Sequence, residues 1–283
     1  PDDHIPCGYS GICSNGKMLL LSTVCRKNGG DMIYTSTDSG ESWQIIMNGL
    51  EYSRFDWNIP YMKPRYNGGG NCVHWISDIK LSPFDSDTAL FNTGTGLFMI
   101  TGLASGDVLV KPFCEGIEET VHLNVYTTPH GRNRIIDIIG DLGGFAFKDY
   151  DSECENSFAN ENGDRYITCL NADLTLSDPE YIVATPRGNW TGKTKGGLIL
   201  SKDSGSTWER LPMPRGLSEF IDKKLDNIEK PNVDSGWTAI SADGKRIMWA
   251  VAGGRGFSNK AVCYTDDEGK TWQKSIFTDN SGN

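Results

Sequence analysis

The chain has 283 residues, of which 27 are basic and 37 acidic, so its formal net charge is −10. This balance argues against a nucleic-acid partner, because phosphate groups bind a basic face, and it weakly favours a neutral or cationic ligand. No apolar run approaches the roughly 20 residues that a membrane-spanning helix needs. With 37% hydrophobic residues the chain has enough apolar surface for one large or two smaller packed domains.

Short apolar segments alternate with turns of Gly, Asn, Asp and Ser along most of the chain. The segments are rich in Ile, Val, Leu, Tyr and Thr, which is typical of β-strands. In chain order the predicted strands lie in 17–24, 31–36, 88–100, 134–141, 181–186, 196–203, 246–252 and 261–267. One segment, 215–230, has the spacing of a helix. The pattern predicts an all-β protein, which leaves a sandwich, a barrel or a propeller.

One eight-residue pattern, Ser/Thr-x-Asp-x-Gly-x-Ser/Thr-Trp, occurs at 36–43, 201–208 and 265–272. We expect its Asp to bond the turn amides, its Gly to supply a positive φ and its Trp to be a buried anchor between sheets. A hairpin of this kind resembles the Asp box of sialidase-like β-propellers. The second and third copies lie about one propeller blade apart, and blades between the first and second must lack the box. We interpret the three aspartates as structural.

Five further motifs, taken in order, resemble the second half of glycoside hydrolase family 74, the xyloglucan-cleaving double propellers. The motifs are HWISDIKLSPFDSD from His74, NTGTGLFM from Asn92, EGIEETVHLNV from Glu115, IIGDLGGF from Ile138 and GWTAISADGKRIMWA from Gly236. The resemblance implies a β-propeller with Asp-box hairpins, part of a seven-bladed double-propeller enzyme. It assigns 1–50 to the end of a first propeller domain and 51–283 to several blades of a second. Because family chains are about twice as long, we expect a fragment or one of several chains.

By this resemblance Asp141, in GDLGG, is the catalytic general acid. The position of Asp141 at the end of an apolar strand fits this role, because partial desolvation of the carboxyl would favour the protonated form that an acid catalyst needs. Gly143 and Gly144 lack side chains, so we expect them to let a bulky substrate approach closely. Taken by itself, the motif reads more simply as an Asp-containing turn.

Two departures from the family pattern affect this prediction. Where family members usually continue Phe-Arg-His, the chain has Ala146 and Phe147 after Phe145, which changes the expected sugar contacts. Glycoside hydrolysis also needs a second carboxylate. The family supplies it from an Asp-Ile-Gly-Gly motif that the sequence lacks, so we expect it outside this chain.

Aromatic and polar residues of the expected loops are candidate substrate contacts. Trp57 and Tyr61 belong to an aromatic, Gly-rich segment suited to sugar stacking, and Trp57 is equally expected to anchor the segment to the core. Further candidates, each with a structural alternative, are Asp78, Trp190 and Arg255. Glu118 and Glu119 are more simply explained as structural carboxylates, since at most one of two adjacent strand residues faces a cleft.

Eight cysteines include no CxxC pair, and the four histidines form no close sequence cluster, so the sequence predicts no metal site. Cys154 and Cys169 flank a polar segment that a disulfide would close, and buried thiols are the alternative. Asn189 begins a glycosylation sequon.

We predict a glycoside hydrolase that cleaves the β-1,4-glucan backbone of a plant polysaccharide, in particular xyloglucan, with inversion and no cofactor. Its partners are the polysaccharide and the rest of the same enzyme, and its location is extracellular. The polar opening PDDHIPCG is not a signal peptide, which fits a processed, a truncated or a cytosolic chain. Alternatives are a sialidase or polysaccharide lyase on the same scaffold, and a non-catalytic glycan- or protein-binding propeller.

Overall fold

The protein is described here by a computed structural model, which places residues 7–26, 30–49, 54–59, 62, 73–118, 120–154, 156–188, 194–214, 236–251 and 262–282. These residues form β-strands, turns and irregular segments. The part of the chain that is described has no helix long and apolar enough to cross a membrane. The helix predicted at 215–230 lies outside these residues.

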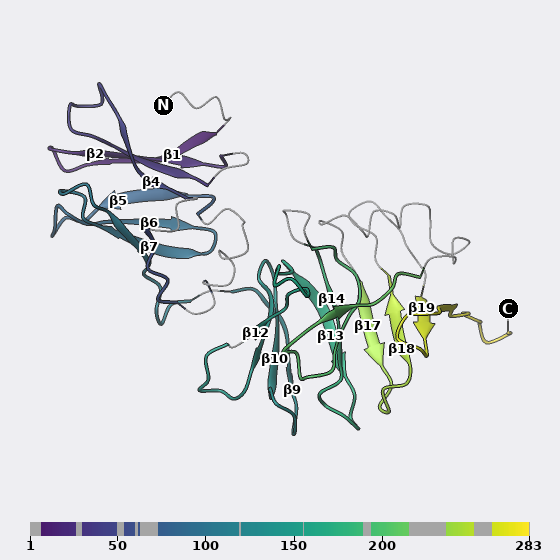
Figure 1. The fold of residues 1–283 in the computed structure, drawn as a ribbon. Coiled ribbons are helices and arrows are strands. Elements are labelled where there is room, and N and C mark those ends of the chain that lie inside the picture. Colours follow the sequence, from purple (N-terminus) through teal and green to yellow (C-terminus); the bar gives the residue numbers. More distant parts are fainter. Residues whose placement is uncertain are drawn as a thin grey trace. The chain divides into compact units, whose positions relative to one another are not determined.

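The chain divides into two compact units, Pro1–Thr120 and Val121–Asn283. The first contains two four-stranded antiparallel sheets, each formed by four consecutive strands (Figure 1). Their strands are β1 (Gly8–Ser14), β2 (Leu19–Val24), β3 (Met32–Ser36) and β4 (Gln44–Asn48), then β5 (Asp78–Leu81), β6 (Ala89–Thr93), β7 (Gly96–Thr101) and β8 (Leu109–Pro112).

The two sheets of the first unit share one core, in which Ile33 of β3 and Phe91 of β6 are nearly inaccessible. Strand β1 contacts β5 directly. The predicted domain boundary at residue 50 falls between these two sheets.

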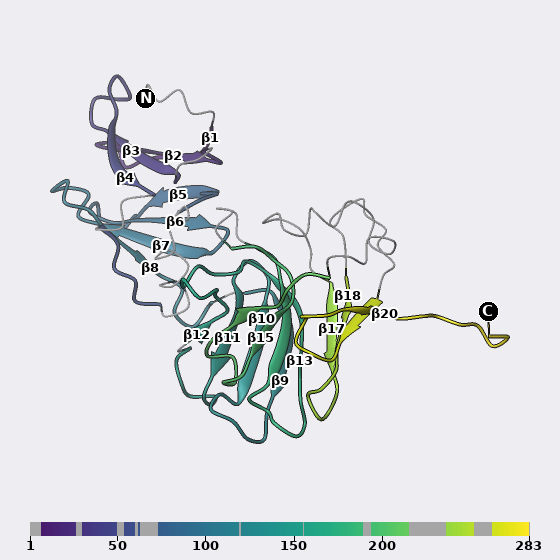
Figure 2. The ribbon, with the colours of Figure 1, turned by 45° about the vertical axis from the view of Figure 1, so that its right-hand side comes forward.

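The second unit contains three four-stranded sheets with the same consecutive order, side by side in both ribbon views (Figures 1 and 2). Their strands are β9 (His122–Thr127), β10 (Ile135–Ile139), β11 (Gly143–Phe147) and β12 (Asn156–Ser157); β13 (Cys169–Leu174), β14 (Ile182–Pro186), β15 (Ile199–Ser201) and β16 (Glu209–Arg210); and β17 (Trp237–Ile240), β18 (Ile247–Ala250), β19 (Val262–Thr265) and β20 (Gln273–Lys274).

Apolar side chains fill the space between neighbouring sheets of the second unit. One cluster joins β9–β12 to β13–β16, and Trp208 packs there against Phe158 with ring centroids 4.4 Å apart. A second cluster joins β13–β16 to β17–β20 around Trp249, which is fully buried. Each sheet therefore packs face to face on the next. This is how the blades of a β-propeller pack, and the predicted all-β fold is confirmed.

The three Asp boxes lie at equivalent places, between the third and fourth strands of their sheets. In the first box Ser42 donates to Asp38 through its backbone N (2.9 Å) and its hydroxyl (2.5 Å). Gly40 has a φ of 92°, as predicted. The sheets β5–β8 and β9–β12 lack the box, as the repeat spacing requires. The predicted burial of the Trp is confirmed for Trp208, whereas Trp43 and Trp272 are half-buried.

Candidate active site

Asp141 lies in the turn between β10 and β11, and its side chain is exposed. Its φ is 61°, in the left-handed region where Asp is one of the few tolerated non-glycine residues. The strand before it is apolar because Ile136 and Ile138 face the core shared with the next sheet. The hairpin therefore presents a carboxylate to solvent, and the expected partial burial of this side chain is not found.

Two hydrogen bonds hold the Asp141 turn against its neighbours on both sides. The backbone N of Asp141 donates to Oγ1 of Thr168 (2.9 Å), a buried side chain just before β13. The N of Gly140 donates to the carbonyl of Val121 (2.8 Å), just before β9. The turn is thus fixed to the preceding strand of its own sheet and to the next sheet.

The segment after Asp141 is fixed in the same way. Gly143 N donates to the carbonyl of Ile167 (2.6 Å). Arg165, which is 9% exposed, donates from Nη2 to the carbonyl of Leu142 (2.8 Å), and its guanidinium lies 4.9 Å from the ring centroid of Phe145. A backbone held at this many points is preorganised, which a catalytic carboxylate requires.

Gly143 and Gly144 are both buried, and the structure gives a packing reason for each. A Cβ on Gly143, whose φ is 81°, would lie 2.6 Å from the carbonyl oxygen of Tyr166. A Cβ on Gly144 would lie 2.7 Å from the carbonyl oxygen of Asp137 and 2.9 Å from the ring of Phe158. The space that glycine leaves is thus filled by the protein itself, and contact of these residues with substrate stays a prediction.

Trp57 is half-buried and packs on the core of the first unit. Its ring stacks on Phe55, with centroids 4.9 Å apart and 6° between planes, and meets Phe98 edge-on at 6.3 Å. These contacts favour the anchoring alternative. Three other predicted contacts, Tyr61, Trp190 and Arg255, lie outside the described residues, as does Glu119.

Asp78, on β5, has its carboxylate occupied by neighbours. Oδ1 accepts from Nζ of Lys80 (2.5 Å) and from the N of Ile79 (2.9 Å). The hydrogen bond from Lys80 lowers the pKa of this carboxyl. Glu118 is exposed and its Oε2 accepts from the N of Gly116 (2.8 Å), a turn contact.

The Asp-box carboxylates are bound by their own turns. Hydrogen bonds from Ser42 lower the pKa of Asp38 to about 2, and those from Thr271 lower the pKa of Asp267 to about 2. Burial raises the pKa of Asp203, but hydrogen bonds from its turn outweigh burial and lower it overall. Carboxylates held ionised in this way are poor general acids.

A Tyr–Glu pair joins the residue just before β14 to the third Asp-box turn. The hydroxyl of Tyr181 donates to Oε1 of Glu268 (2.9 Å), which also lies 2.7 Å from Nζ of Lys202. Burial and the Glu268 hydrogen bond raise the pKa of Tyr181. A Tyr that resists ionisation is a poor nucleophile, so this pair does not support the sialidase alternative.

Sequence comparison finds xyloglucanases. A xyloglucanase from Paenibacillus sp is 23% identical over 95% of this chain and 26% of its own length. An oligoxyloglucan-reducing end-specific xyloglucanase from Emericella nidulans is 25% identical over 87% of this chain and 33% of its own. No protein-family model matches the chain.

The comparison of structures agrees. The crystal structure of the GH74 xyloglucanase from Xanthomonas campestris aligns with a TM-score of 0.73 and 22% identity, covering 99% of this chain and 36% of that one. The chain is therefore similar in sequence to xyloglucanases and in fold to a GH74 xyloglucanase. It spans a third or less of the length of these curated relatives. The predicted fold and the stated resemblance are therefore confirmed.

The predicted disulfide alternative is wrong, because Cys154 and Cys169 are both free thiols. Burial raises the pKa of the Cys169 thiol to about 12, and its Sγ donates to the carbonyl of Asn171 (3.3 Å). Within the described ranges no three His, Cys, Asp or Glu side chains are grouped as a metal site.

Sequence reasoning missed the residues that support the Asp141 turn. Thr168 and Arg165 follow it by more than 20 positions and reach it because the next sheet packs alongside. The side chains of His122 and Asp137 are hydrogen-bonded to each other across the adjoining strands β9 and β10. A polar residue inside the apolar run IIDII was the one available signal, since a buried carboxylate needs a partner.

Proposed function

We propose that the chain is part of a glycoside hydrolase that cleaves the β-1,4-glucan backbone of xyloglucan, with Asp141 as its general acid. The observation that carries the proposal is an exposed carboxylate on a turn fixed to β9 and to the start of β13. The xyloglucanase relatives support the substrate. Because the chain covers a minor part of their length, its activity is an inference.

In the proposed inverting mechanism, the carboxyl of Asp141 donates its proton to the glycosidic oxygen as the C–O bond breaks. A carboxylate outside this chain deprotonates a water that attacks the anomeric carbon from the opposite face. Inverting enzymes keep the two groups about 6.5–9.5 Å apart to admit that water. Acid and base suffice for this reaction, so we propose no cofactor. Bound sugar would supply the desolvation that the exposed turn lacks.

The same proposal assigns partners and location. The partners are the polysaccharide and the remaining part of the enzyme, with 1–50 ending a first propeller and 51–283 contributing blades of a second. A polymeric plant substrate is met outside the cell, so we propose an extracellular location. The proposed sugar contacts are Trp57, Tyr61, Asp78, Gly143, Gly144, Trp190 and Arg255.

Asp141→Asn tests this function in the protein that carries the chain. The amide keeps the size of the side chain but cannot donate the proton, so kcat on xyloglucan should fall about 10²- to 10⁴-fold with little change in KM. Asp149→Asn is the control, because Asp149 is another exposed aspartate of the same sheet and lies between β11 and β12. Full reducing-sugar release by Asp141→Asn would refute the role. Glucan binding without turnover in the wild type would favour a binding module.

A further inference from the structure

Asp141 has a left-handed backbone, and a hydrogen bond from a distant residue holds it. Its φ is 61°, in a region where residues with a Cβ are crowded. Its backbone N donates to Oγ1 of Thr168 (2.9 Å), which lies 27 positions later in the chain. Thr168 is 8% exposed, so water competes little for this hydroxyl. The conformation of the proposed acid therefore depends on a residue outside its own hairpin.

The Asp boxes use the same kind of bond locally. Ser39, Ser204 and Glu268 also have a positive φ, and each belongs to an Asp-box turn. In every box the N of the next residue, a glycine, donates to the hydroxyl of the first box residue at 2.8–2.9 Å. A Ser or Thr hydroxyl thus stabilises a left-handed turn three times from within the turn. At Asp141 the hydroxyl comes instead from the segment that enters the neighbouring sheet.

The backbone of Thr168 is itself held between two strands. Gly143 forms a parallel bridge with Thr168, and the N of Gly143 donates to the carbonyl of Ile167 (2.6 Å). On the other side the N of Arg187, directly after β14, donates to the carbonyl of Thr168 (2.7 Å). Because its backbone is fixed on both sides, Thr168 can hold the amide of Asp141 at a defined position.

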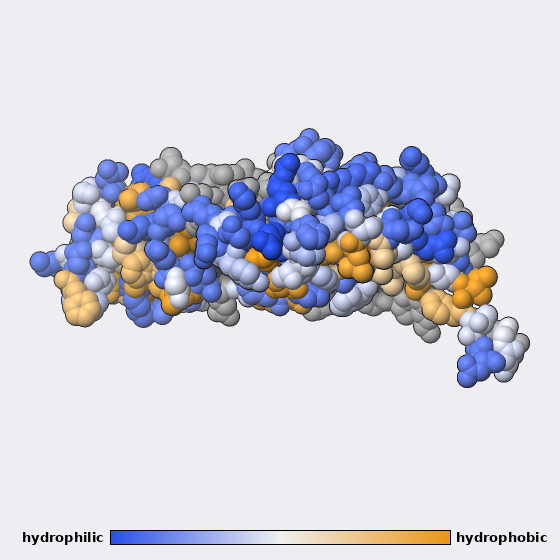
Figure 3. Space-filling model, turned by 90° about the horizontal axis from the view of Figure 1, so that it is seen from below, coloured by the Kyte–Doolittle hydropathy of each residue, from blue (hydrophilic) through white to orange (hydrophobic). Residues whose placement is uncertain are grey.

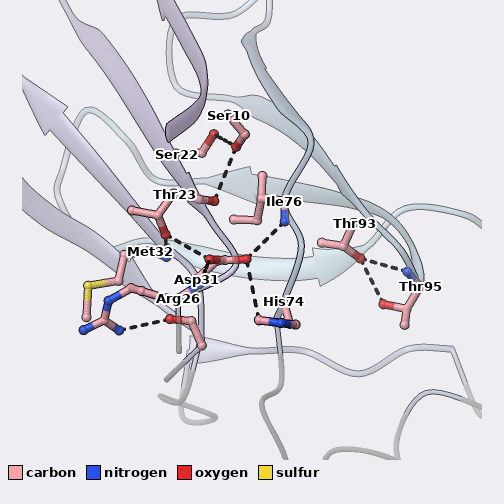
Figure 4. A network of polar contacts seen from close by, with 11 residues as sticks. Ser10, Ser22, Thr23, Arg26, Asp31, Met32, His74, Ile76, Thr93 and Thr95 are labelled. Atoms are coloured by element: carbon pink, nitrogen blue, oxygen red, sulfur yellow. Dashed lines mark hydrogen bonds and ion pairs between the residues drawn. The ribbon is translucent and has the colours of Figure 1, made fainter. Parts of the chain in front are cut away.

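This arrangement leaves the carboxylate of Asp141 available. Figure 4 shows the opposite case in the first unit, where the buried side chain of Asp31 is at the centre of a polar network. Its two oxygens accept from Oγ1 of Thr23 (3.1 Å) and from the N of Ile76 (3.2 Å). Such a carboxylate is committed to the fold. At Asp141 the bond to Thr168 is made by the backbone, and the side chain is exposed.

Exposure alone does not distinguish Asp141 from other aspartates. In Figure 3 hydrophilic residues cover much of the face that is drawn, and hydrophobic residues form separate patches between them. Asp149 is also exposed, and its N donates to Oγ of Ser152 (3.0 Å), three residues later. Asp141 differs because a buried hydroxyl from outside its hairpin fixes its backbone.

We propose that Thr168 is a positioning residue for the proposed general acid, and that its hydroxyl sets the direction in which the Asp141 carboxyl reaches the glycosidic oxygen. The direction of a side chain depends on the backbone conformation of its residue. A misplacement of about 1 Å can lower a rate about 10²-fold. This inference rests on the proposed function. Its addition is that the neighbouring sheet, rather than the hairpin of Asp141 itself, orients the acid.

A residue that positions a general acid should matter only when the leaving group needs a proton. A sugar hydroxylate is a poor leaving group, so the glycosidic oxygen of xyloglucan is protonated as the C–O bond breaks. Dinitrophenolate leaves as the anion with the bonding electron pair and needs no proton. Loss of the Thr168 hydroxyl should therefore slow cleavage of xyloglucan and spare a dinitrophenyl β-glycoside of a xyloglucan oligosaccharide.

The test measures kcat and KM of Thr168→Val and Thr168→Ser on both substrates, in the protein that carries the chain. Valine keeps the β-branched shape but removes the acceptor, so kcat on xyloglucan should fall about 10- to 100-fold with KM unchanged. On the dinitrophenyl glycoside the kcat of this variant should stay close to the wild-type value. Thr168→Ser keeps the hydroxyl and should recover most of the activity on xyloglucan.

Thr185→Val is the matched control. Thr185 is also buried, on β14, and its Oγ1 donates to the carbonyl of Gly236 (2.6 Å), a contact that does not involve the Asp141 turn. Both valine variants lose a buried hydroxyl, so Tm should fall in both. Only Thr168→Val should discriminate between the two substrates.

Asp141→Asn, measured in parallel, separates this inference from the proposed function. Wild-type kcat on xyloglucan in Thr168→Val, with Asp141→Asn impaired, would overturn the positioning role and leave the function standing. Equal losses of Thr168→Val on both substrates would also overturn it, since the residue would then be structural, as would a Thr168→Ser variant no more active than Thr168→Val. Cleavage of xyloglucan at the wild-type rate by Asp141→Asn would overturn both.

Discussion

Nδ1 of His122 lies 2.9 Å from Oδ2 of Asp137, joining edge strand β9 to β10. The Asp137 side chain is 9% exposed, whereas that of His122 is 54% exposed. The next backbone link along this strand pair runs from Gly140 to Val121, directly before Asp141. The contact between His122 and Asp137 therefore secures the strands that position the Asp141 turn.

His122→Val should lower the free energy of unfolding by about 1–3 kcal/mol, because it removes the ring partner of a buried carboxylate. Replacing both residues, as His122→Val with Asp137→Ala, should restore part of that loss, since no buried charge then remains. Urea unfolding of the two single variants and the double variant gives the coupling energy. Strictly additive losses would show that the pair contributes nothing beyond its separate residues.

Gly143→Ala should destabilise the protein and lower kcat. The left-handed φ of 81° costs about 1–2 kcal/mol for any residue with a Cβ, and the contact with the Tyr166 carbonyl adds to this. Gly163→Ala is the control, because Gly163 has a φ of 78° but a Cβ added there would meet no atom within 4 Å. Thermal unfolding and xyloglucan turnover are measured for both variants. If both substitutions had equal effects, close packing would not be the reason for glycine at position 143.

Trp208→Ala should cost about 3–5 kcal/mol, the usual loss for a large aromatic in a core. Trp208 is 4% exposed and packs against Phe158, so its removal opens a cavity between two sheets. Trp43→Ala removes the equivalent residue of the first Asp box, which is half-buried, and should cost less. Chemical denaturation of both variants measures the difference. A larger loss at Trp43 would contradict the burial argument.

The repeat and the strands were predictable because they are local. An Asp box is eight consecutive residues whose hydrogen bonds stay within the turn, and an apolar segment between turn formers specifies its own strand. Burial of Trp208 and half-burial of Trp43 depend instead on which sheet packs beside each box. The burial expected from the same box sequence was therefore correct for Trp208 and wrong for Trp43 and Trp272.

The site was less predictable because its contacts are distant in sequence. The pairing of His122 with Asp137 depends on a register that shifts between Ile138 and Ile139. Gly143 and Gly144 were assigned to substrate access, whereas Tyr166 and Phe158 fill the space. None of these relations has a local sequence pattern.

The Asp boxes should lose their stabilising carboxylate bonds only in strong acid. The pKa of Asp267 is lowered to about 2, against 3.8 for an ordinary Asp, chiefly by the hydroxyl of Thr271. Because the folded pKa is the lower one, the stabilisation is complete above the unfolded pKa. It is lost as the pH falls from about 4 through about 2. Thr271→Val keeps the carboxylate but removes its largest partner, so the pKa of Asp267 should rise toward its ordinary value. Loss of stability in acid should then begin at higher pH. Carboxyl chemical shifts by NMR and Tm against pH measure both effects, with Thr88→Val as a control outside the boxes. Unaltered Asp267 titration in Thr271→Val would mean that the backbone of the turn, rather than the hydroxyl, keeps the carboxylate ionised.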